Sequence, residues 1–242
     1  AIFASPFKHD AFFDQALPDP VYARKARELC DETGAMLVID DVRAGFRVAR
    51  DCSWSLIGIE PDLSCWGKAV ANGYPLSILL GSDRCRTGAG SLYVTGSFWF
   101  AAVPMAAALE TLKIIRETDY LEHTIRIGDR LRAGLAAAAA RHGLGFRQTG
   151  PSQMPIMLFD DDPDFRIGYA WAEEMLARGV YVHPFHNMFI AACMTNADID
   201  FAVEAGDAAF AAVIARWDTI QPSPALMEMS AARAKEKQGV LA

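Results

Sequence analysis

The stretch Ala35-Met36-Leu37-Val38-Ile39-Asp40-Asp41 decides the fold of this chain. Its apolar part is uninterrupted, which is typical of a strand that is covered on both faces in a parallel sheet. The apolar run then ends in two carboxylates. Because ligands of open α/β sheets bind beyond the carboxyl ends of the strands, Asp40 stands where a binding site is expected.

A helix is predicted directly before this strand. Asp19 suits the N-cap, Pro20 suits the first helical position, and apolar residues follow at helical spacing until Gly34, where we expect the helix to end. Further elements are predicted over the same part of the chain: strands at 1–4, 63–66 and 76–80, and a helix at 101–116. Strands that alternate with helices predict an α/β sheet with helical crossovers.

The second half of the chain has a different rhythm and predicts a smaller α+β unit. The expected elements are a helix over 119–142, strands over 146–149 and 155–159, a helix over 167–178, strands over 180–183 and 189–194, and a helix over 198–217. We therefore divide the chain into a first domain at 1–118, a small C-terminal α+β domain at 119–220, and a tail at 221–242.

Composition excludes several classes of protein. Hydrophobic residues make up 52% of the 242 residues and charged residues 22%, so the chain can bury a sizeable core. The net charge of 23 − 30 = −7 argues against nucleic-acid partners, and no apolar run reaches the ~18 residues of a membrane span. Five widely spaced cysteines without a Cys-x-x-Cys pair argue against a disulfide framework or a zinc site, and predict a reducing, cytoplasmic location.

Lys68 is the first candidate for chemistry. It is the only charged residue between Asp62 and Asp83, and its neighbours are apolar residues and glycines. A buried amine loses its proton readily, and a neutral amine is what Schiff-base chemistry needs. The alternative is a lysine that extends from a surface turn into water.

Asp40 is the second candidate. A carboxylate at the end of a buried strand can hold a positively charged ring nitrogen, a metal ion or a ribose hydroxyl, or it can simply cap a helix. No histidine or cysteine accompanies Asp40 and Asp41 at ligand spacing, which argues against a metal. The pair His183 and His186 surrounds Pro184 at a predicted strand end, where it is more typical of a pocket wall than of zinc chelation.

Three segments together resemble the class III (ω-) aminotransferase family, which includes glutamate-1-semialdehyde aminomutase. They are Leu37-Val38-Ile39-Asp40-Asp41-Val42-Arg43-Ala44-Gly45-Phe46-Arg47, Pro61-Asp62-Leu63-Ser64-Cys65-Trp66-Gly67-Lys68 and Pro104-Met105-Ala106-Ala107-Ala108-Leu109. Their order and intervals agree with the family pattern. The resemblance implies the fold type I of enzymes that use pyridoxal 5′-phosphate (PLP), with 1–118 as part of the large, PLP-binding domain and a mainly parallel sheet.

The resemblance also implies roles for individual residues. Lys68 would form a Schiff base with PLP and move the proton at the substrate's α-carbon, and Asp40 would pair with the pyridine nitrogen. Val42 would pack against a face of the ring. Ser97, with Thr95 close by, falls where the family places a hydroxyl that reaches the phosphate of the neighbouring subunit's cofactor, which implies a homodimer with shared active sites.

The substrate is expected to be a small amine or amino acid together with a keto acid or aldehyde. His186, Asn187 and Met188 lie in a segment that resembles one facing the family's active site, and they are predicted to contact the substrate. One departure from the family pattern is Asp41, where a glutamate is usual. The family's phosphate-gripping turn and its stacking aromatic would precede Ala1, which predicts that the chain is a fragment or that the rest is supplied separately.

Three functions remain open on the sequence. The first is amino transfer between two molecules, and the second is the intramolecular transfer of an aminomutase, which uses the same cofactor machinery. The third is a non-catalytic remnant that keeps the fold and has lost the chemistry.

Overall fold

The computed structural model describes residues 1–228 and 231–232, and the chain divides into two compact units. Unit 1 comprises Ala1–Lys8 and Ala16–Thr124, and unit 2 comprises His9–Gln15 and Ile125–Ala242. The division after Thr124 differs from the predicted one after residue 118, and no sequence signal assigned His9–Gln15 to the second unit. Residues 229–230 and 233–242 of the predicted tail lie outside the described residues.

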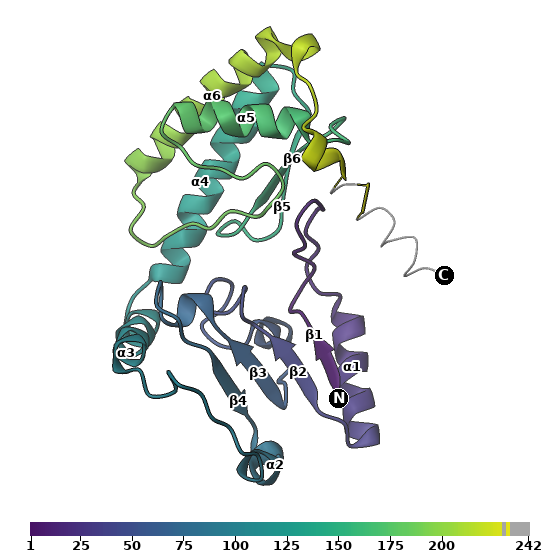
Figure 1. The fold of residues 1–242 in the computed structure, drawn as a ribbon, viewed down its shortest axis with the longest axis vertical. Helices are drawn as coiled ribbons and strands as arrows, with labels where there is room; N and C mark the ends of the chain where they lie inside the picture. The colour runs from purple at the N-terminus through teal and green to yellow at the C-terminus, as the bar shows by residue number, and fades with distance from the viewer. Residues whose placement is uncertain (229–230, 233–242) are drawn as a thin grey trace. The chain divides into compact units, whose positions relative to one another are not determined.

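A four-stranded sheet forms the centre of unit 1. Its strands follow one another in the order β1 (Ile2–Ala4), β2 (Leu37–Asp40), β3 (Leu63–Trp66) and β4 (Ile78–Gly81), as Figure 1 shows. The first three strands are parallel, and β4 runs antiparallel to β3 at the edge. The predicted α/β fold with a mainly parallel sheet is confirmed.

Helix α1 (Pro20–Thr33) covers β2 and follows the sequence signals closely. The Asp19 carboxylate accepts a hydrogen bond of 2.8 Å from the Val21 N–H at its start, and Gly34 ends it at φ 74°, a left-handed conformation that glycine adopts without a Cβ clash. The buried face of α1 packs with Leu37 and Ile39 of β2 into one apolar cluster. The strand is therefore apolar throughout because both of its faces are covered.

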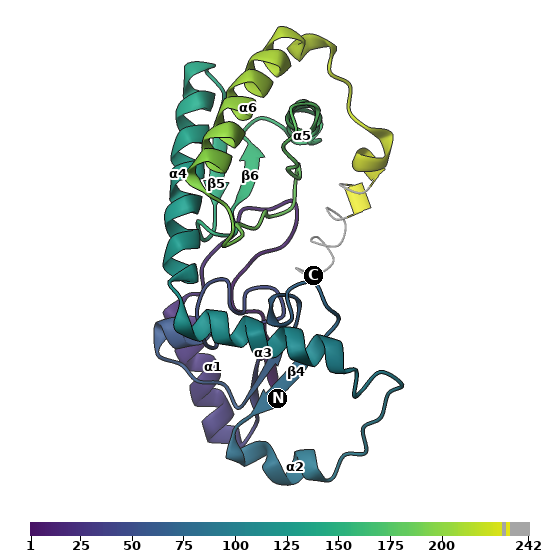
Figure 2. The same ribbon diagram turned by 90° about the vertical axis from the view of Figure 1, so that its left-hand side faces the viewer.

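Unit 1 also contains short 3₁₀ turns and two further helices. They are the short 3₁₀ turns η1 (Ser53–Ile57), η2 (Lys68–Val70) and η3 (Asp83–Cys85), and the helices α2 (Arg86–Gly90) and α3 (Ala102–Glu117). Figure 2 shows the segment 91–101 that joins α2 to α3 as an extended excursion of the chain.

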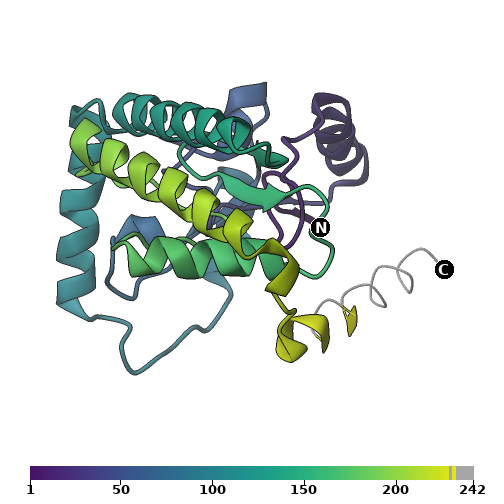
Figure 3. The same cartoon turned by 90° about the horizontal axis from the view of Figure 1, so that it is seen from above.

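The described part of unit 2 contains a β-hairpin and several helices. Strands β5 (Phe146–Thr149) and β6 (Ile156–Phe159) pair antiparallel. The unit also contains most of α4 (Tyr120–Arg141), which begins in unit 1, together with α5 (Arg166–Ala177), α6 (Asn196–Ala215) and the 3₁₀ turn η4 (Trp217–Thr219). Figures 2 and 3 show α6 between α4 and α5. Trp171 and Phe210 stack at 5.4 Å between ring centroids in the core. None of the described helices combines the length and apolar character that a membrane crossing requires.

The strands predicted over 180–183 and 189–194 are wrong. The whole segment 178–195 is irregular, and single hydrogen bonds join it to the residues just before β6, from Met188 N to Pro155 O (2.8 Å) and from Ile190 N to Gln153 O (2.9 Å). Val180, Val182 and Met188 pack against the core of unit 2. Their apolar character therefore reflects the packing of a loop against the core. A short apolar run in a sequence does not distinguish such a loop from a strand.

Candidate active site

The carboxyl edge of the parallel strands in unit 1 brings Asp40 and Lys68 to the same side of the sheet. Asp40 ends β2, and the strand register places it opposite Cys65 of the neighbouring parallel strand β3. Lys68 follows the end of β3 at Trp66 by two residues. Because parallel strands point the same way, both functional groups are carried at the edge where ligands of α/β sheets bind.

Val42 contacts both Asp40 and Gly67, the residue before Lys68. The half-buried Asp40 carboxylate accepts a hydrogen bond of 3.0 Å from the Val42 N–H through Oδ1. A Cβ placed on Gly67 would lie 3.3 Å from Cγ1 of Val42, so the valine side chain rests on the Gly67 backbone next to Lys68. The structure thus assembles three of the residues that the sequence nominated, although they are 28 positions apart from Asp40 to Lys68.

The Lys68 side chain is exposed, so the expectation of a lysine buried in an apolar pocket is wrong for this chain. The apolar sequence around it divides in the structure: Val70 and Ala71 are buried, whereas Asn72, Gly73, Tyr74 and Pro75 lie on the surface. Lys68 itself has φ 47°, a left-handed conformation that costs a non-glycine residue free energy and is concentrated at functional sites. It lines an open cavity together with Gly73, Tyr74, Pro75, Leu76 and Ser77.

The cavity beside Lys68 includes residues that the sequence analysis missed. Tyr74 and Ser77 bring two hydroxyl groups to it. The signal available was the turn Asn72-Gly73, where both residues have positive φ (44° and 108°) and the chain folds back beside Lys68. Asparagine and glycine are the residues that adopt this conformation most readily.

The third sequence segment packs on the second. Ala108 of α3 lies in one buried cluster with Val70 and Ala71, which follow Lys68 directly. Small side chains on α3 therefore allow the helix to approach η2. This contact explains why an alanine-rich stretch accompanies the lysine motif in the sequence.

Ser97 and Thr95 lie in the exposed segment 91–101 before α3. Neither residue lines the cavity beside Lys68. Their contact with a cofactor phosphate stays a prediction.

His186, Asn187 and Met188 belong to unit 2. Nδ1 of His186 lies 2.8 Å from the Asn187 carbonyl oxygen, Asn187 is buried, and Met188 packs against the core of that unit. Burial, with a smaller contribution from His186, lowers the pKa of the neighbouring His183. The contact of His186, Asn187 and Met188 with the substrate stays a prediction.

Asp62 has a structural role that the sequence analysis did not assign. Its buried carboxylate accepts hydrogen bonds from Leu37 N (2.8 Å), Arg27 Nη1 (2.9 Å) and Arg84 Nη1 (2.8 Å). Burial opposes ionisation, but these donors outweigh it and lower the pKa of Asp62. The carboxylate therefore ties the start of β2 to α1 and η3, which fixes β2 beside β3.

The residues at this edge fit PLP. Gly67 leaves the space that a Cβ would fill beside Val42, and the Lys68 amine is accessible. Oδ1 of Asp40 is used by Val42, whereas Oδ2 accepts no hydrogen bond within residues 1–228 and 231–232 and is available to a ring N–H. The described residues contain no group of three or more histidine, cysteine, aspartate or glutamate side chains that could hold a metal ion.

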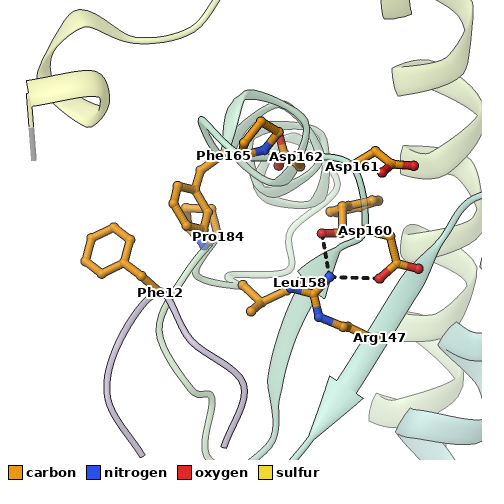
Figure 4. A pocket seen from close by; sticks show the side chains of 10 residues that line it. Phe12, Arg147, Leu158, Asp160, Asp161, Asp162, Phe165 and Pro184 are labelled. Carbon is orange, nitrogen blue, oxygen red and sulfur yellow. Dashed lines mark hydrogen bonds and ion pairs between the residues drawn. The ribbon is translucent and has the colours of Figure 1, made fainter. Parts of the chain in front are cut away.

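A second pocket lies within unit 2 and has a different character. Arg147 crosses its floor and donates to Asp14 (2.9 Å), Asp160 (2.8 Å) and the Phe159 carbonyl oxygen (2.9 Å), as Figure 4 shows in part. Phe12, which stacks on Phe185 at 4.1 Å, and Phe165 form the apolar wall. The buried Asp162 is engaged with the N–H groups of Ile167 and Gly168 at the start of α5. These side chains satisfy one another, so we place the candidate active site in unit 1.

Comparison with known proteins shows the family of this chain. The sequence model of the family described as Aminotransferase class-III matches residues 15–209, and the chain belongs to that family. Of its relatives, the aminopentol aminotransferase of Sphingopyxis macrogoltabida is 62% identical over 96% of this chain and 55% of its own length. Glutamate-1-semialdehyde 2,1-aminomutase 2 of Halalkalibacterium halodurans is 33% identical over 80% of this chain and 48% of its own length.

Solved structures are similar as well. The PLP internal aldimine form of the FumI protein of Sphingopyxis sp. MTA144 matches with a TM-score of 0.91 and 63% identity, over 93% of this chain and 54% of that one. A transaminase with PLP bound matches with a TM-score of 0.75 at 21% identity, over 83% of this chain and 50% of that one, which shows the fold alone. The chain thus spans about half the length of the curated relatives it matches.

Proposed function

We propose that the protein transfers an amino group between an amine or amino acid and a carbonyl compound, with PLP as cofactor. The observation that carries this proposal is the assembly of Asp40, Val42 and Gly67-Lys68 at the carboxyl edge of the sheet. An acceptor carboxylate, an apolar contact and an accessible amine are the groups that the PLP ring and aldehyde require. Membership of the class-III family supports the same activity.

Each of these residues has a task in the proposed reaction. When bound, PLP supplies an electron sink that stabilises a carbanion at the carbon bearing the amino group. Lys68 would hold the cofactor covalently through Nζ, and after the incoming amine has replaced it there, the freed Nζ would move the proton at that carbon. Asp40 accepts the N–H of the pyridine nitrogen and keeps it protonated, and Val42 packs on the ring. Ser97, supported by Thr95, contacts the phosphate.

The relatives support a proposal for the substrate class. The relative at 62% identity is named for an aminopentol, which is an amine on a chain that carries several hydroxyl groups. We therefore propose a hydroxylated primary amine as the amino donor and a small keto acid or aldehyde as the acceptor. His186, Asn187 and Met188 are proposed to contact this substrate.

Transfer between two molecules is favoured over the aminomutase reaction and over a remnant without activity. The aminotransferase relative is 62% identical and the aminomutase 33% identical, and Lys68 and Asp40 are both present. The test is a chromatographic assay of the full-length protein with an amino-alcohol donor, with and without pyruvate. We expect product only with pyruvate. Turnover of glutamate 1-semialdehyde without an acceptor would instead support the aminomutase reaction. A colourless protein that does not bind added PLP would support the non-catalytic remnant.

A homodimer with shared active sites is part of the proposal. The segment 91–101 exposes large apolar side chains, among them Tyr93 (92% exposed), Phe98 (88%) and Phe100 (85%). Contiguous apolar surface of this kind marks an interaction site in a soluble protein. Ser97 and Thr95 lie in the same segment, so a second copy that covers it would receive their hydroxyl groups.

We also propose a cytoplasmic location and a division of labour between the domains. All five cysteines are free, as expected in a reducing compartment. Residues 1–118 are proposed to belong to the PLP-binding domain and residues 119–220 to form the small domain.

A further inference from the structure

Strand β2 leads into two adjacent carboxylates with opposite environments. Asp40 is half-buried and keeps one oxygen available, whereas Asp41 is 1% exposed. Burying a carboxylate costs several kcal/mol unless hydrogen bonds or a cation compensate. The partners of Asp41 are therefore informative about its purpose.

Ser53 and the Cys52 thiol supply the hydrogen-bond partners of Asp41, and Ser53 gives two of them. The Ser53 N–H donates to Oδ2 at 2.9 Å, and the Ser53 hydroxyl donates to Oδ1 in a short hydrogen bond. Within the described part of the chain, no arginine, lysine or histidine forms an ion pair with this carboxylate. Its negative charge is thus held in the interior by neutral donors.

This contact closes the loop that carries the site. The loop leaves β2 at Asp41 and returns at Ser53, the first residue of η1, whose next residue, Trp54, is buried and donates to the Pro6 carbonyl oxygen at 2.7 Å. At the other side of the loop, Phe46 stacks on Trp66 at 4.5 Å. Asp41 therefore anchors the loop that presents Val42 against Gly67.

The charge of Asp41 also changes the pKa values of neighbouring groups. Burial raises the pKa of the Asp41 carboxyl, and the neighbouring Asp40 raises it further against the hydrogen bonds from Ser53 and Cys52. Burial and then Asp41 raise the pKa of the Cys52 thiol to about 12. Cys65, the register partner of Asp40, has a pKa raised by burial, by Asp40 and by Asp41. The two carboxylates therefore act on the same small region.

We infer that Asp41, held by Ser53, is a positioning residue that fixes the Asp40 carboxylate and adds a second negative charge behind it, so that a cationic ring nitrogen at Asp40 is stabilised. The inference rests on the proposed function, since it names what the second carboxylate does for that site. It also gives a reason for an ion in the interior where an apolar residue would pack at lower cost.

The test is a pH titration of the visible absorbance of lysine-bound PLP in the full-length holoenzyme. Asp41→Asn keeps the shape and removes the charge, and we expect the midpoint to fall by about 0.5 to 1 pH unit because a protonated cofactor loses a nearby negative charge. Asp41→Glu restores the charge and should return the midpoint to the wild-type value. The matched control is Asp51→Asn, an exposed aspartate of the same loop, which should leave it unchanged.

A second variant covers the case in which Asp41→Asn does not fold. Ser53→Ala keeps the charge and removes one hydrogen bond, and the equilibrium dissociation constant for PLP should rise roughly three- to tenfold. Ser55→Ala, which removes a hydroxyl donor to Asp51, is the control. If Asp41→Asn and Ser53→Ala lower only the melting temperature, with midpoint and dissociation constant unchanged, the inference is overturned. A wild-type protein without lysine-bound absorbance would instead overturn the proposed function.

Discussion

Lys68 is the residue on which the proposed chemistry depends, and its backbone sets it apart. It has φ 47° directly after Gly67, so the chain turns sharply at the point where the amine is presented. The surrounding fold maintains this conformation by burying Val70 and Ala71 beneath α3. The lysine is thus placed by its neighbours, while its own side chain stays accessible.

Replacement of Lys68 by alanine should abolish activity in the full-length protein. The loss should exceed the roughly 10²- to 10⁴-fold that general acid–base catalysis alone contributes, because the covalent link to PLP is lost as well. Mass spectrometry after borohydride reduction should find PLP on Lys68 in the wild type and on no peptide of the variant. Lys113→Ala, on the exposed side of α3, is the matched control and should keep both. PLP retained covalently by Lys68→Ala would contradict the assignment.

Asp62 is expected to make the stability of unit 1 depend on pH. Its pKa is lowered in the folded protein, so its contribution is present above the unfolded value near 3.9 and is lost as the pH falls through the folded value. Asp62→Asn should cost about 2 to 4 kcal/mol at pH 7, since Arg27 and Arg84 lose a buried partner.

The measurement is thermal unfolding of the wild type and of Asp62→Asn at pH 7 and at descending pH below about 4. The difference in melting temperature should shrink as the pH falls. Asp83→Asn, an exposed aspartate that pairs with Arg86 on the surface, should show little difference at either pH. A difference for Asp62→Asn that is independent of pH would contradict the electrostatic explanation.

At the scale of elements, the loop after β2 is fitted closely against β3. A Cβ on Gly45 would lie 2.6 Å from the Asp41 carbonyl oxygen and 2.7 Å from the Trp66 ring. The Gly45 N–H also donates to that carbonyl oxygen at 2.8 Å. The loop is therefore packed closely at Gly45, three residues after Val42, whose side chain lies against Gly67.

Gly45→Ala should lower the stability of the protein by about 1 to 3 kcal/mol, because a rigid ring and the backbone would have to move apart. It should also weaken PLP binding, measured by equilibrium dialysis. Gly88→Ala is the control: a Cβ there meets nothing within 4 Å, and alanine in helix α2 should be neutral or stabilise by about 0.5 kcal/mol. Equal effects of the two substitutions would show that loop packing does not fix the site.

At the scale of the whole molecule, the exposed apolar segment 91–101 predicts self-association. Light scattering of the full-length protein should give the mass of a dimer at micromolar concentration. The double substitution Phe98→Glu and Phe100→Glu should shift it toward the monomer, because charges would be buried in the interface. Leu176→Glu, at an exposed leucine of α5 in unit 2, should leave the dimer intact. A wild-type monomer would contradict the shared active site.

Much of the architecture was accessible from local sequence patterns. The α1 helix was predicted from its N-cap Asp19 and terminal Gly34, and β3 and β5 were predicted with their exact bounds, since these signals act within a few residues. The strands predicted over 180–183 and 189–194 are irregular in the structure, where Val180 and Val182 pack against a core assembled from α4, α5, α6 and β6. Burial of this kind depends on residues far away in the chain.

The sequence by itself determined the family, the order of strands and helices in unit 1, and the nomination of Asp40, Val42 and Lys68. Only the tertiary structure decided that Val42 rests on Gly67, that the Lys68 side chain is exposed, and that Asp41 and Asp62 are buried carboxylates with opposite pKa shifts. The physical reason is the distance along the chain between the residues that set each property. Caps, turns and periodicity are set by neighbours along the chain, whereas the ionisation and accessibility of a side chain are set by the donors, charges and surfaces that folding brings to it.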